Sequence, residues 1–536
     1  MKTDRSHCSP KSGVVEGAET TPEPSKAKVK ALMARKLKRI QDGGEIRTLD
    51  LFAGCGGIAL GFHAAGYQTV GAVEIDPFAA LSFARNFGKH APHADPATLG
   101  LPRDITKLDP PEFLAGLGIK GPVDDSVDVL VGGPPCQAFA RVGRAKLREV
   151  DSHPQAFKQD PRGNLYLRYL AYIRATRPLA ILMENVPDVL NYGGHNISQE
   201  VCEILEAEGY SCKYTLLNSA YYGVPQMRER MFLVAIHGVA KRSFEFPKPT
   251  HFVNLPSGYE HTRVVALKAT RGGGGSLFND DIFSSDENHL ERPPVPKVGL
   301  PPSITVEQAI YDLPFLDAAK LLKDGDLIRG AKRFDKPLPY GSEPHTGYAR
   351  LMREWPGFEA RDGVYDHVIR YLPRDFKLFK RMKPGDQYPQ AYAMAVTMFK
   401  EEYRKLQRKG HAPAEGTKAW QVLWDSFVPP YDASKFPNKW RKLEADMPSR
   451  TLLAHLGKDS YSHIHPDNGQ GRTISVRDGA RLQSFPDGFL FEGTINPAFK
   501  QIGNAVPPLM AYALARNIRA ALGAKELKDI RVGYIL

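Results

Sequence analysis

The stretch Ile46-Arg47-Thr48-Leu49-Asp50-Leu51-Phe52-Ala53-Gly54-Cys55-Gly56-Gly57 decides the predicted fold, because an apolar run leads directly into a glycine-rich turn. Residues 46 to 52 are typical of a buried strand, and residues 58 to 65 are typical of a helix. Glycine lets the backbone turn sharply and approach a ligand closely. A strand, a glycine-rich turn and a helix in this order indicate a ligand-binding unit of an α/β fold.

The same alternation continues toward the C-terminus. Further strands are predicted at residues 69–75, 127–131, 179–183, 212–218 and 230–236, and helices at 77–87, 165–176 and 198–208. Strands that alternate with helices in this way predict an α/β protein with a doubly wound, mostly parallel sheet.

Several residues point to a nucleoside cofactor at one end of this sheet. Glu74 ends the second predicted strand, at the separation where such folds bind ribose hydroxyls. The turn that contains Gly54 and Gly56 does not read Gly-x-Gly-x-x-Gly, which disfavours a dinucleotide, and Phe52 offers an apolar face to an adenine. Asp104 is expected to accept a hydrogen bond from an amino group at the end of a third strand; the alternative is that it caps a helix.

A cysteine follows two prolines in Val131-Gly132-Gly133-Pro134-Pro135-Cys136-Gln137. Open α/β folds place their chemistry at the carboxyl edge of the sheet, so Cys136 is a candidate nucleophile on a stiff loop. Glu184 follows another strand at that edge, where burial would raise its pKa and let it donate a hydrogen bond. Arg228 and Arg230 could hold a base carbonyl or a phosphate. The alternatives are an inert buried thiol, a carboxylate that orders a loop, and a surface ion-pair cluster.

The rest of the chain divides into three further parts. Residues 1–45 lack a core pattern, and the segment from Lys26 to Arg39 is basic without an acidic residue, so we expect a disordered basic tail rather than a short helix that forms on DNA. We expect residues 46–238 to form the first part of the α/β domain, residues 239–449 a large inserted second domain, and residues 450–536 a return segment that completes the first domain. The run from Arg271 to Ser276 is expected to be a flexible hinge or loop.

Composition sets broad limits on the kind of protein. The chain has 536 residues, a net charge of +12 and a hydrophobic fraction of 42%. The charge fits a polyanionic partner, although a basic but ordinary enzyme would have the same balance. Five irregularly spaced cysteines without a Cys-x-x-Cys pair predict neither a zinc site nor a disulfide framework. No segment has the length and hydrophobicity of a membrane span, so a cytoplasmic protein without bound metal is expected.

Taken in order, these motifs resemble those of the cytosine-5 DNA methyltransferases, which use S-adenosyl-L-methionine and have a Rossmann-like class I fold. The resemblance covers about residues 46 to 236 and 449 to 521. It rests on the turn from Asp50 to Gly57, Glu74, Asp104, Pro134 to Gln137, Arg162 to Leu165, Glu184 to Val186, Gln226 to Arg230, Arg472 to Arg477, Arg481 to Asp487 and Gln501 to Pro508. The resemblance implies that residues 46–238 and 450–536 form the catalytic domain and that residues 239–449 form a large inserted target-recognition domain. The chain departs from the family at Ile75, where an aromatic residue is frequent, in the doubled glycine and proline before Cys136, and in the length of the inserted segment.

The resemblance implies a mechanism. Cys136 would add to carbon 6 of a cytosine flipped out of the duplex. Glu184 would hold the base at N3 and the exocyclic amine, and Arg230 would contact the base carbonyl with Arg228 beside it. Around the cofactor, Phe52 would stack on the adenine, Glu74 would bind the ribose, Asp104 would bind the adenine amine, and Gly54, Gly56, Pro134, Leu165 and Asn504 would complete the site. The implied partner is double-stranded DNA near the nucleoid, the implied oligomeric state is a monomer, and a companion restriction endonuclease is an open expectation.

Three alternatives remain at this point. One branch of the same family methylates tRNA, but its Cys-Phe-Thr tripeptide is absent here. A non-catalytic DNA-binding protein on the same scaffold would have lost reacting groups, whereas Cys136, Glu184 and Arg230 are all present. A dinucleotide-dependent oxidoreductase is disfavoured by the glycine pattern.

Overall fold

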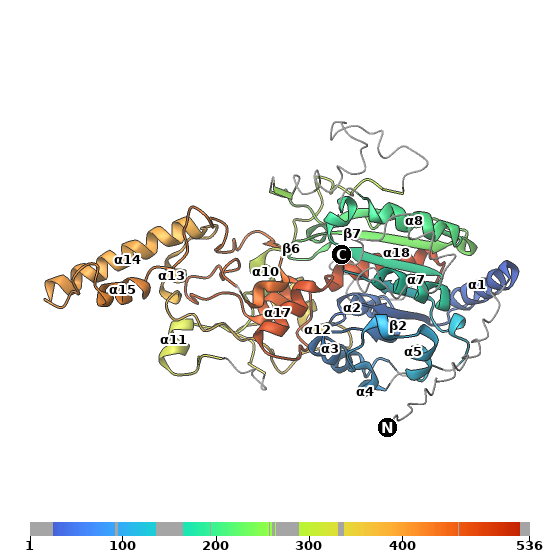
Figure 1. The fold of residues 1–536 in the computed structure, drawn as a ribbon, viewed down its shortest axis with the longest axis horizontal. Coiled ribbons are helices and arrows are strands. Elements are labelled where there is room, and N and C mark those ends of the chain that lie inside the picture. The colour runs from blue at the N-terminus through green and yellow to red at the C-terminus, as the bar shows by residue number, and fades with distance from the viewer. Residues whose placement is uncertain are drawn as a thin grey trace, which may run out of the picture.

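A six-stranded sheet forms the centre of the protein (Figure 1). The structure, a computed structural model, describes residues 25–91, 95–119, 121–135, 164–192, 195–256, 258–259, 263, 289–330, 337–458 and 460–525. The strands are β1 (Ile46–Leu51), β2 (Tyr67–Val73), β3 (Val129–Gly132), β4 (Ala180–Asn185), β5 (Tyr210–Asn218) and β7 (Glu229–His237), in the order β2-β1-β3-β4-β7-β5; β6 (Gln226–Met227) pairs separately with β8 (Ser449–Arg450).

The helices of the described residues follow the strands and then dominate the second half of the chain. They are α1 (Lys26–Gln41), α2 (Gly57–Ala64), α3 (Pro77–Phe87), α4 (Pro96–Leu99), α5 (Pro110–Gly116), α7 (Asn164–Thr176), α8 (Ile197–Ala207), α10 (Val306–Ile310), α11 (Ala318–Lys323), α12 (Gly347–Glu354), α13 (Phe376–Arg381), α14 (Tyr388–Arg408), α15 (Lys418–Asp425), α16 (Val476–Leu482), α17 (Ile495–Asn504) and α18 (Pro508–Ala521). Within the part of the chain that the structure describes, no helix has both the length and the apolar character to cross a membrane.

The pairing of the strands gathers their ends at one edge of the sheet. β1 pairs in parallel with β2 and β3, and β3 pairs in parallel with β4, whereas β7 lies antiparallel between β4 and β5. In this register Leu51 lies opposite both Val73 and Gly132, and Gly132 lies opposite Met183. The predicted α/β class with a mostly parallel sheet is therefore confirmed, and the residues that follow β1, β2, β3 and β4 meet at one edge.

One predicted strand is wrong. Asp104 does not follow a strand; its carboxylate caps a short 3-10 turn, Ile105–Lys107, by accepting from the backbone N–H of Thr106 at 3.0 Å. The structure thus shows the alternative, in which Asp104 is a helix cap. The cap is favourable because the aspartate side chain accepts from a backbone N–H group that has no main-chain partner at the start of a helical turn.

The expectation of a disordered tail is wrong for residues 26–41, which form α1. Four of its side chains are buried, namely Met33, Lys36, Leu37 and Ile40. The ammonium group of Lys36 donates to the carbonyls of Val127, Thr176 and Arg177 at 2.7, 2.9 and 3.0 Å. These carbonyls lie just before β3 and at the C-terminal end of α7, so α1 packs at the edge of the sheet opposite to the one where Glu74 and Glu184 lie. Basic composition alone did not reveal the apolar face that anchors the helix.

The segment that contains Val506 and Pro508 packs closely against α2. A Cβ on Gly57 would come within 2.3 Å of the carbonyl oxygen of Val506, and a Cβ on Gly61 within 2.4 Å of that of Pro508. Only glycine permits this close approach of α18 and the segment before it to α2.

Two hydrophobic clusters underlie the inserted segment. The main core extends into it through Val306, Tyr348 and Trp355, while a second cluster contains Phe379, Phe399 and Trp440. The expected boundaries at residues 239 and 449 stay predictions, and the hinge expected at residues 271–276 lies outside the described residues.

Candidate active site

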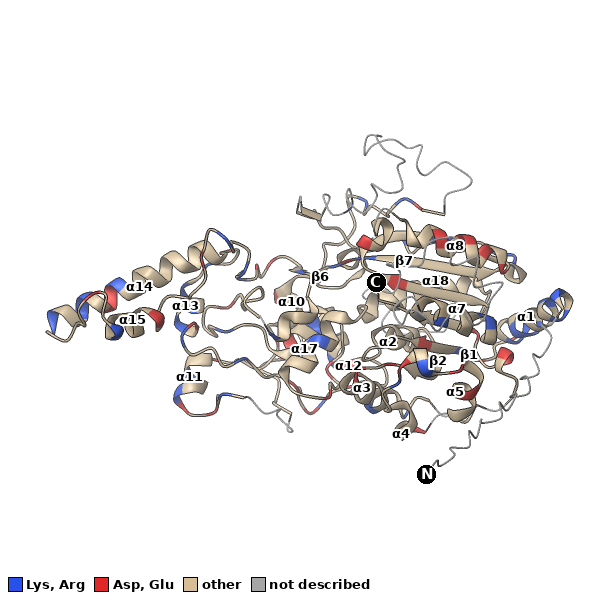
Figure 2. Cartoon of the chain, viewed as in Figure 1, with Lys and Arg blue, Asp and Glu red and all other residues tan. Residues whose placement is uncertain are grey.

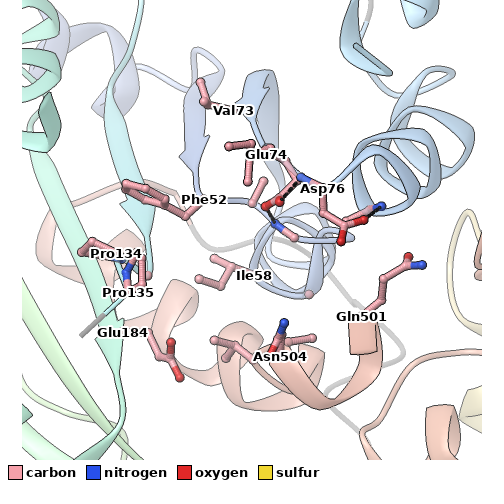
Figure 3. Close-up of a pocket in the computed structure, with 18 of the residues that line it drawn as sticks. Phe52, Ile58, Val73, Glu74, Asp76, Pro134, Pro135, Glu184, Gln501 and Asn504 are labelled. Atoms are coloured by element: carbon pink, nitrogen blue, oxygen red, sulfur yellow. Dashed lines mark hydrogen bonds between the residues drawn. The ribbon is translucent and has the colours of Figure 1, made fainter. Parts of the chain in front are cut away.

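A cavity of about 530 Å³ opens at the edge of the sheet where β1, β2, β3 and β4 end (Figure 3). Its wall includes residues from the glycine-rich turn after β1, from the ends of β2, β3 and β4, and from the return segment. Glu74 lies on one side of it and Glu184 on the other, with Ile58 between them in the view of Figure 3. The cavity has the size of a small-molecule site.

Glu74 is held by the main chain of the turn that it faces. Its Oε2 accepts from the N–H of Gly54 and its Oε1 from the N–H of Asp76, both at 2.8 Å. Burial raises the pKa of Glu74, and these two N–H groups oppose that rise by stabilising the carboxylate. The carboxylate is thus fixed in direction at the cavity wall, as a group that binds a ligand hydroxyl needs to be.

The apolar part of the wall comes from Phe52, Ile58, Val73 and Ile75. Phe52 has a φ of 59°, a left-handed conformation that is strained for an aromatic residue. Ile75 is 65% exposed and stands at the mouth of the cavity. The wall could enclose a flat apolar ring.

Glu184 and Arg230 form an ion pair inside the same cavity. The Nε of Arg230 lies 3.0 Å from Oε1 of Glu184, and both side chains are largely buried. Burial raises the pKa of Glu184, and the positive charges of Arg230 and Arg228 oppose the rise without cancelling it. A carboxyl group in this setting can donate a hydrogen bond at neutral pH more readily than an exposed one.

Arg228 has a different role from Arg230. Its Nη1 donates to the carbonyl of Leu452 at 3.0 Å and its Nη2 to the carbonyl of Gly503 at 2.9 Å. The residue is buried and joins the start of the strand that carries Arg230 to two places in the return segment, Leu452 and Gly503. Each of its terminal nitrogens therefore has a main-chain partner, while the residue also lines the cavity, and its expected contact with a base or phosphate stays a prediction.

The segment that leads toward Cys136 is tied to the end of β4. Nδ2 of Asn185 donates to the carbonyl of Pro134 at 2.8 Å, and a Cβ on Gly133 would come within 2.9 Å of Oε2 of Glu184. Cys136 itself lies outside the described residues. The roles of Gly133 and Asn185 were not predicted, although the amide beside Glu184 and the doubled glycine were visible in the sequence.

The remaining expected residues fall into two groups. Asp104, Pro134, Leu165 and Asn504 line the cavity, together with Gly54, and their expected contacts with a cofactor stay predictions. Gly56 is not among the lining residues, whereas Gly57 is. A Cβ on Gly56 would come within 2.4 Å of the ring of Phe87, so glycine is needed there for packing rather than for ligand approach. In the part of the chain that is described, no three His, Cys, Asp or Glu side chains gather in a way that could hold a metal ion.

Comparison with known proteins agrees with this geometry. The profile of the family described as C-5 cytosine-specific DNA methylase matches residues 46–314 and 368–520. One relative is M.OihORF3336P of Oceanobacillus iheyensis, whose assignment as a type II methyltransferase is itself inferred. It is 39% identical to this chain over 480 residues, which cover 88% of this chain and 95% of that protein. The type II methyltransferase M.AgeI of Thalassovita gelatinovora is 30% identical over 492 residues, 89% of this chain and all of that protein.

A solved structure supports the fold. A protein encoded in an Escherichia coli prophage, described by inference as a DNA modification methyltransferase, superimposes with a TM-score of 0.52 at 19% identity. The match covers 89% of this chain and 99% of that one. At this identity the likeness concerns the arrangement of the backbone alone.

Proposed function

Because this chain belongs to the family of C-5 cytosine-specific DNA methylases, we propose that it transfers a methyl group from S-adenosyl-L-methionine to carbon 5 of a cytosine flipped out of duplex DNA. The observation that carries the proposal is that a single cavity has a fixed carboxylate and apolar walls at one side and the Glu184–Arg230 pair at the other. One side suits a nucleoside cofactor and the other suits the polar edge of a base.

The residues around Glu74 fit S-adenosyl-L-methionine. The carboxylate of Glu74 would accept hydrogen bonds from the ribose hydroxyls, and Phe52 and Ile75 would enclose the adenine. Asp104 would accept from the adenine amine through an oxygen that the turn at Thr106 leaves available. When bound, the cofactor supplies an electrophilic methyl group on a sulfonium. The absence of the Gly-x-Gly-x-x-Gly pattern agrees with a cofactor that has no pyrophosphate.

On the other side, Glu184 and Arg230 would hold the target base. A protonated Glu184 would donate to N3 of the cytosine and accept from the exocyclic amine, while Arg230 would donate to the base carbonyl oxygen. Withdrawal of electron density at N3 makes carbon 6 more electrophilic. The buried position of Glu184 favours this protonated form.

Cys136 would act as the nucleophile. Its thiolate would add to carbon 6, which moves an electron pair to carbon 5, and carbon 5 would then accept the methyl group. Removal of the carbon 5 proton by a base would return the electron pair and release the thiolate, so that no atom of the protein is consumed. The Asn185–Pro134 hydrogen bond would hold the segment before Cys136 against the strand that bears Glu184.

The biological setting is part of the proposal. The type II names of the two bacterial relatives favour a role in restriction and modification, with a companion endonuclease. The enzyme would act as a monomer on cytoplasmic, nucleoid DNA, and residues 239–449 would read the target sequence.

The replacement Cys136→Ser tests the mechanism. It should abolish methyl transfer to duplex DNA and leave binding of radiolabelled S-adenosyl-L-methionine within about twofold of the wild type, because the hydroxyl is a far weaker nucleophile than a thiolate. Full activity of this variant would refute the covalent mechanism. Deep sequencing of bisulfite-treated DNA from cells that express the wild type would identify the methylated base and its sequence context, and a parallel assay with tRNA would expose activity of the other branch of the family.

A further inference from the structure

A helical arm projects from the inserted segment, away from the central sheet (Figure 1). We define the arm as residues 388–425, which comprise α14 and α15. The 21 residues of α14 make it about 31 Å long. The ring of Phe399 packs edge-on against Trp420 and Trp424, which stack on each other with centroids 5.3 Å apart. These aromatic contacts brace the outer half of α14 along one side and make the arm stiff.

The side of α14 that α15 leaves uncovered has an unusual composition. We define its exposed stripe as Pro389, Ala393, Thr397, Lys400, Arg404 and Arg408, which are exposed and spaced by three or four residues. Residues at this spacing lie on one face of a helix. The stripe is small and uncharged toward the base of the arm and basic toward its tip, and it contains no carboxylate.

The neighbouring acidic residues do not neutralise the stripe. Glu401 pairs with Arg381, and Glu402 pairs with Lys405. Among the residues that the structure describes, no carboxylate lies within ion-pair distance of Lys400, Arg404 or Arg408. Figure 2 shows charges of both signs on α14, and the two acidic residues of α14, Glu401 and Glu402, are in the pairs just named. Three cations therefore remain available on a stiff surface.

The spacing of these cations suits a nucleic-acid backbone. Two residues four positions apart on a helix are separated by about 6 Å along its axis. Successive phosphates of one DNA strand are separated by about 3.4 Å along the duplex axis, so each step in the stripe spans roughly two phosphates. The small side chains at Ala393 and Thr397 would let a backbone approach closely.

The position of the inserted segment relative to the candidate active site supports the same partner. The segment rejoins the catalytic part where β8 pairs with β6, at Gln226–Ser449 and Met227–Arg450. β6 directly precedes Arg228 and Arg230. DNA whose target base reaches the cavity must therefore pass close to the base of the segment that bears the arm.

We propose that the exposed stripe of α14 binds phosphates of duplex DNA in the flank of the target site, outside the base pairs that are read. The choice of duplex DNA as the partner rests on the proposed function, whereas the basic character of the exposed stripe is independent of it. The contact adds affinity and leaves the sequence preference unchanged, since phosphates carry no sequence information.

The experiment compares two variants with equal loss of charge. The arm variant is Lys400→Gln/Arg404→Gln/Arg408→Gln. The control variant is Lys28→Gln/Lys30→Gln/Lys38→Gln, which changes exposed lysines of α1, another basic helix, on the opposite edge of the sheet. Circular dichroism would verify that both retain their helix content. Fluorescence anisotropy would measure binding to duplexes of about 14 and about 40 base pairs with the same centre, over a range of salt concentrations.

We expect the arm variant to bind the long duplex at least tenfold more weakly and the short duplex within twofold of the wild type. Its plot of log affinity against log salt concentration should become shallower by roughly 0.9 for each phosphate that the arm no longer neutralises. The control variant should match the wild type on both duplexes. Equal losses in the two variants, equal losses on the two duplexes, or no loss at all would each overturn the inference. A wild type that binds DNA in this way but transfers no methyl group would refute the proposed function and leave the stripe as a DNA-binding surface.

Discussion

At the scale of single residues, the carboxyl group of Glu184 is the most closely constrained group of the candidate active site. Burial raises its pKa, Arg230 pairs with one oxygen, and the bare Cα of Gly133 leaves room for the other oxygen. In the proposed mechanism this carboxyl group donates to and accepts from one base, which requires a fixed direction, because a displacement of about 1 Å can reduce a rate roughly a hundredfold. The absence of a side chain at Gly133 therefore makes room for Oε2 of Glu184.

The substitution Gly133→Ala tests this function of a missing side chain. Its Cβ would push Oε2 of Glu184 from its place, since the two atoms would be only 2.9 Å apart. We expect kcat to fall roughly tenfold to a hundredfold while the free energy of unfolding changes by about 1 kcal/mol, because the closest atom is the end of a flexible side chain and the backbone oxygen of Glu184 lies farther away, at 3.3 Å. Steady-state methyl transfer and urea denaturation would measure the two effects. Gly116→Ala is the matched control, since a Cβ there meets no atom within 4 Å; normal activity of Gly133→Ala would show that the exact position of Glu184 is unimportant.

At the scale of elements, α1 shows how a basic segment becomes part of the fold. The helix begins with Ser25 as its cap and buries four side chains against the catalytic part. Arg39 pairs with the buried carboxylate of Asp128, which Arg47 of β1 also contacts at 3.1 Å. Burial lowers the pKa of Lys36 to about 8, and the nearby Asp128 opposes this shift. The folded state therefore binds the proton of Lys36 less tightly than the unfolded state, so this residue makes stability rise as the pH increases from about 8 toward the ordinary lysine pKa near 10.5.

Replacement of Lys36 by methionine should release α1. Three main-chain carbonyls would lose their donor, and each buried carbonyl left without one costs about 1–3 kcal/mol. We expect the amides of residues 26–41 to exchange with deuterium at least tenfold faster, as measured by mass spectrometry, with little change in the amides of the sheet. Lys38→Met, at an exposed position of the same helix, should exchange like the wild type. Unchanged protection of α1 in the Lys36 variant would mean that the apolar face alone holds the helix.

At the scale of the whole molecule, buried ion pairs join segments that are far apart in the sequence. Arg481 of α16 binds Asp487 in the return segment and Asp312 in the inserted segment, and its Nη1 donates to the carbonyl of Ala309 at 2.9 Å. The hydroxyl of Tyr340 donates to Asp487 at 2.7 Å. Burial alone would raise the pKa of Asp487, but Arg481, Arg477 and Tyr340 together hold it below its ordinary value. The network fixes the inserted segment against the part that completes the catalytic domain.

Acid should weaken this network in a defined direction. Because the pKa of Asp487 is lower in the folded state, its contribution to stability is fully present above the unfolded value of about 3.9 and is lost as the pH falls below that value. We expect Asp487→Asn to lower the free energy of unfolding by roughly 3–5 kcal/mol at pH 7, because it leaves Arg481 without one buried partner, and by less at pH 3. Urea denaturation of both proteins at the two pH values would measure the difference. A difference that stays constant or grows toward pH 3 would contradict the assigned pairing.

Much of the fold and the site could be predicted from local patterns. The strands that place Phe52, Glu74 and Glu184 at the sheet edge were visible as apolar runs, and the helix at residues 77–87 was predicted with its observed bounds. The short turn at Asp104 was mistaken for the end of a strand, since a few residues carry too little periodicity to separate the two. The apolar face of α1 was missed because its spacing is masked by a high density of lysine and arginine.

The sequence by itself determined the class of sheet, the family and which residues are candidates for the reacting groups, because these depend on local periodicity and on which residues stand in which order. Only the tertiary structure decided what each group touches. It separated Arg228, which binds two main-chain carbonyls, from Arg230, which faces Glu184, although the two stand two positions apart in the chain. The physical reason is that burial and hydrogen bonding depend on segments such as Leu452 and Gly503, which lie more than two hundred residues away and which no local pattern connects to β7.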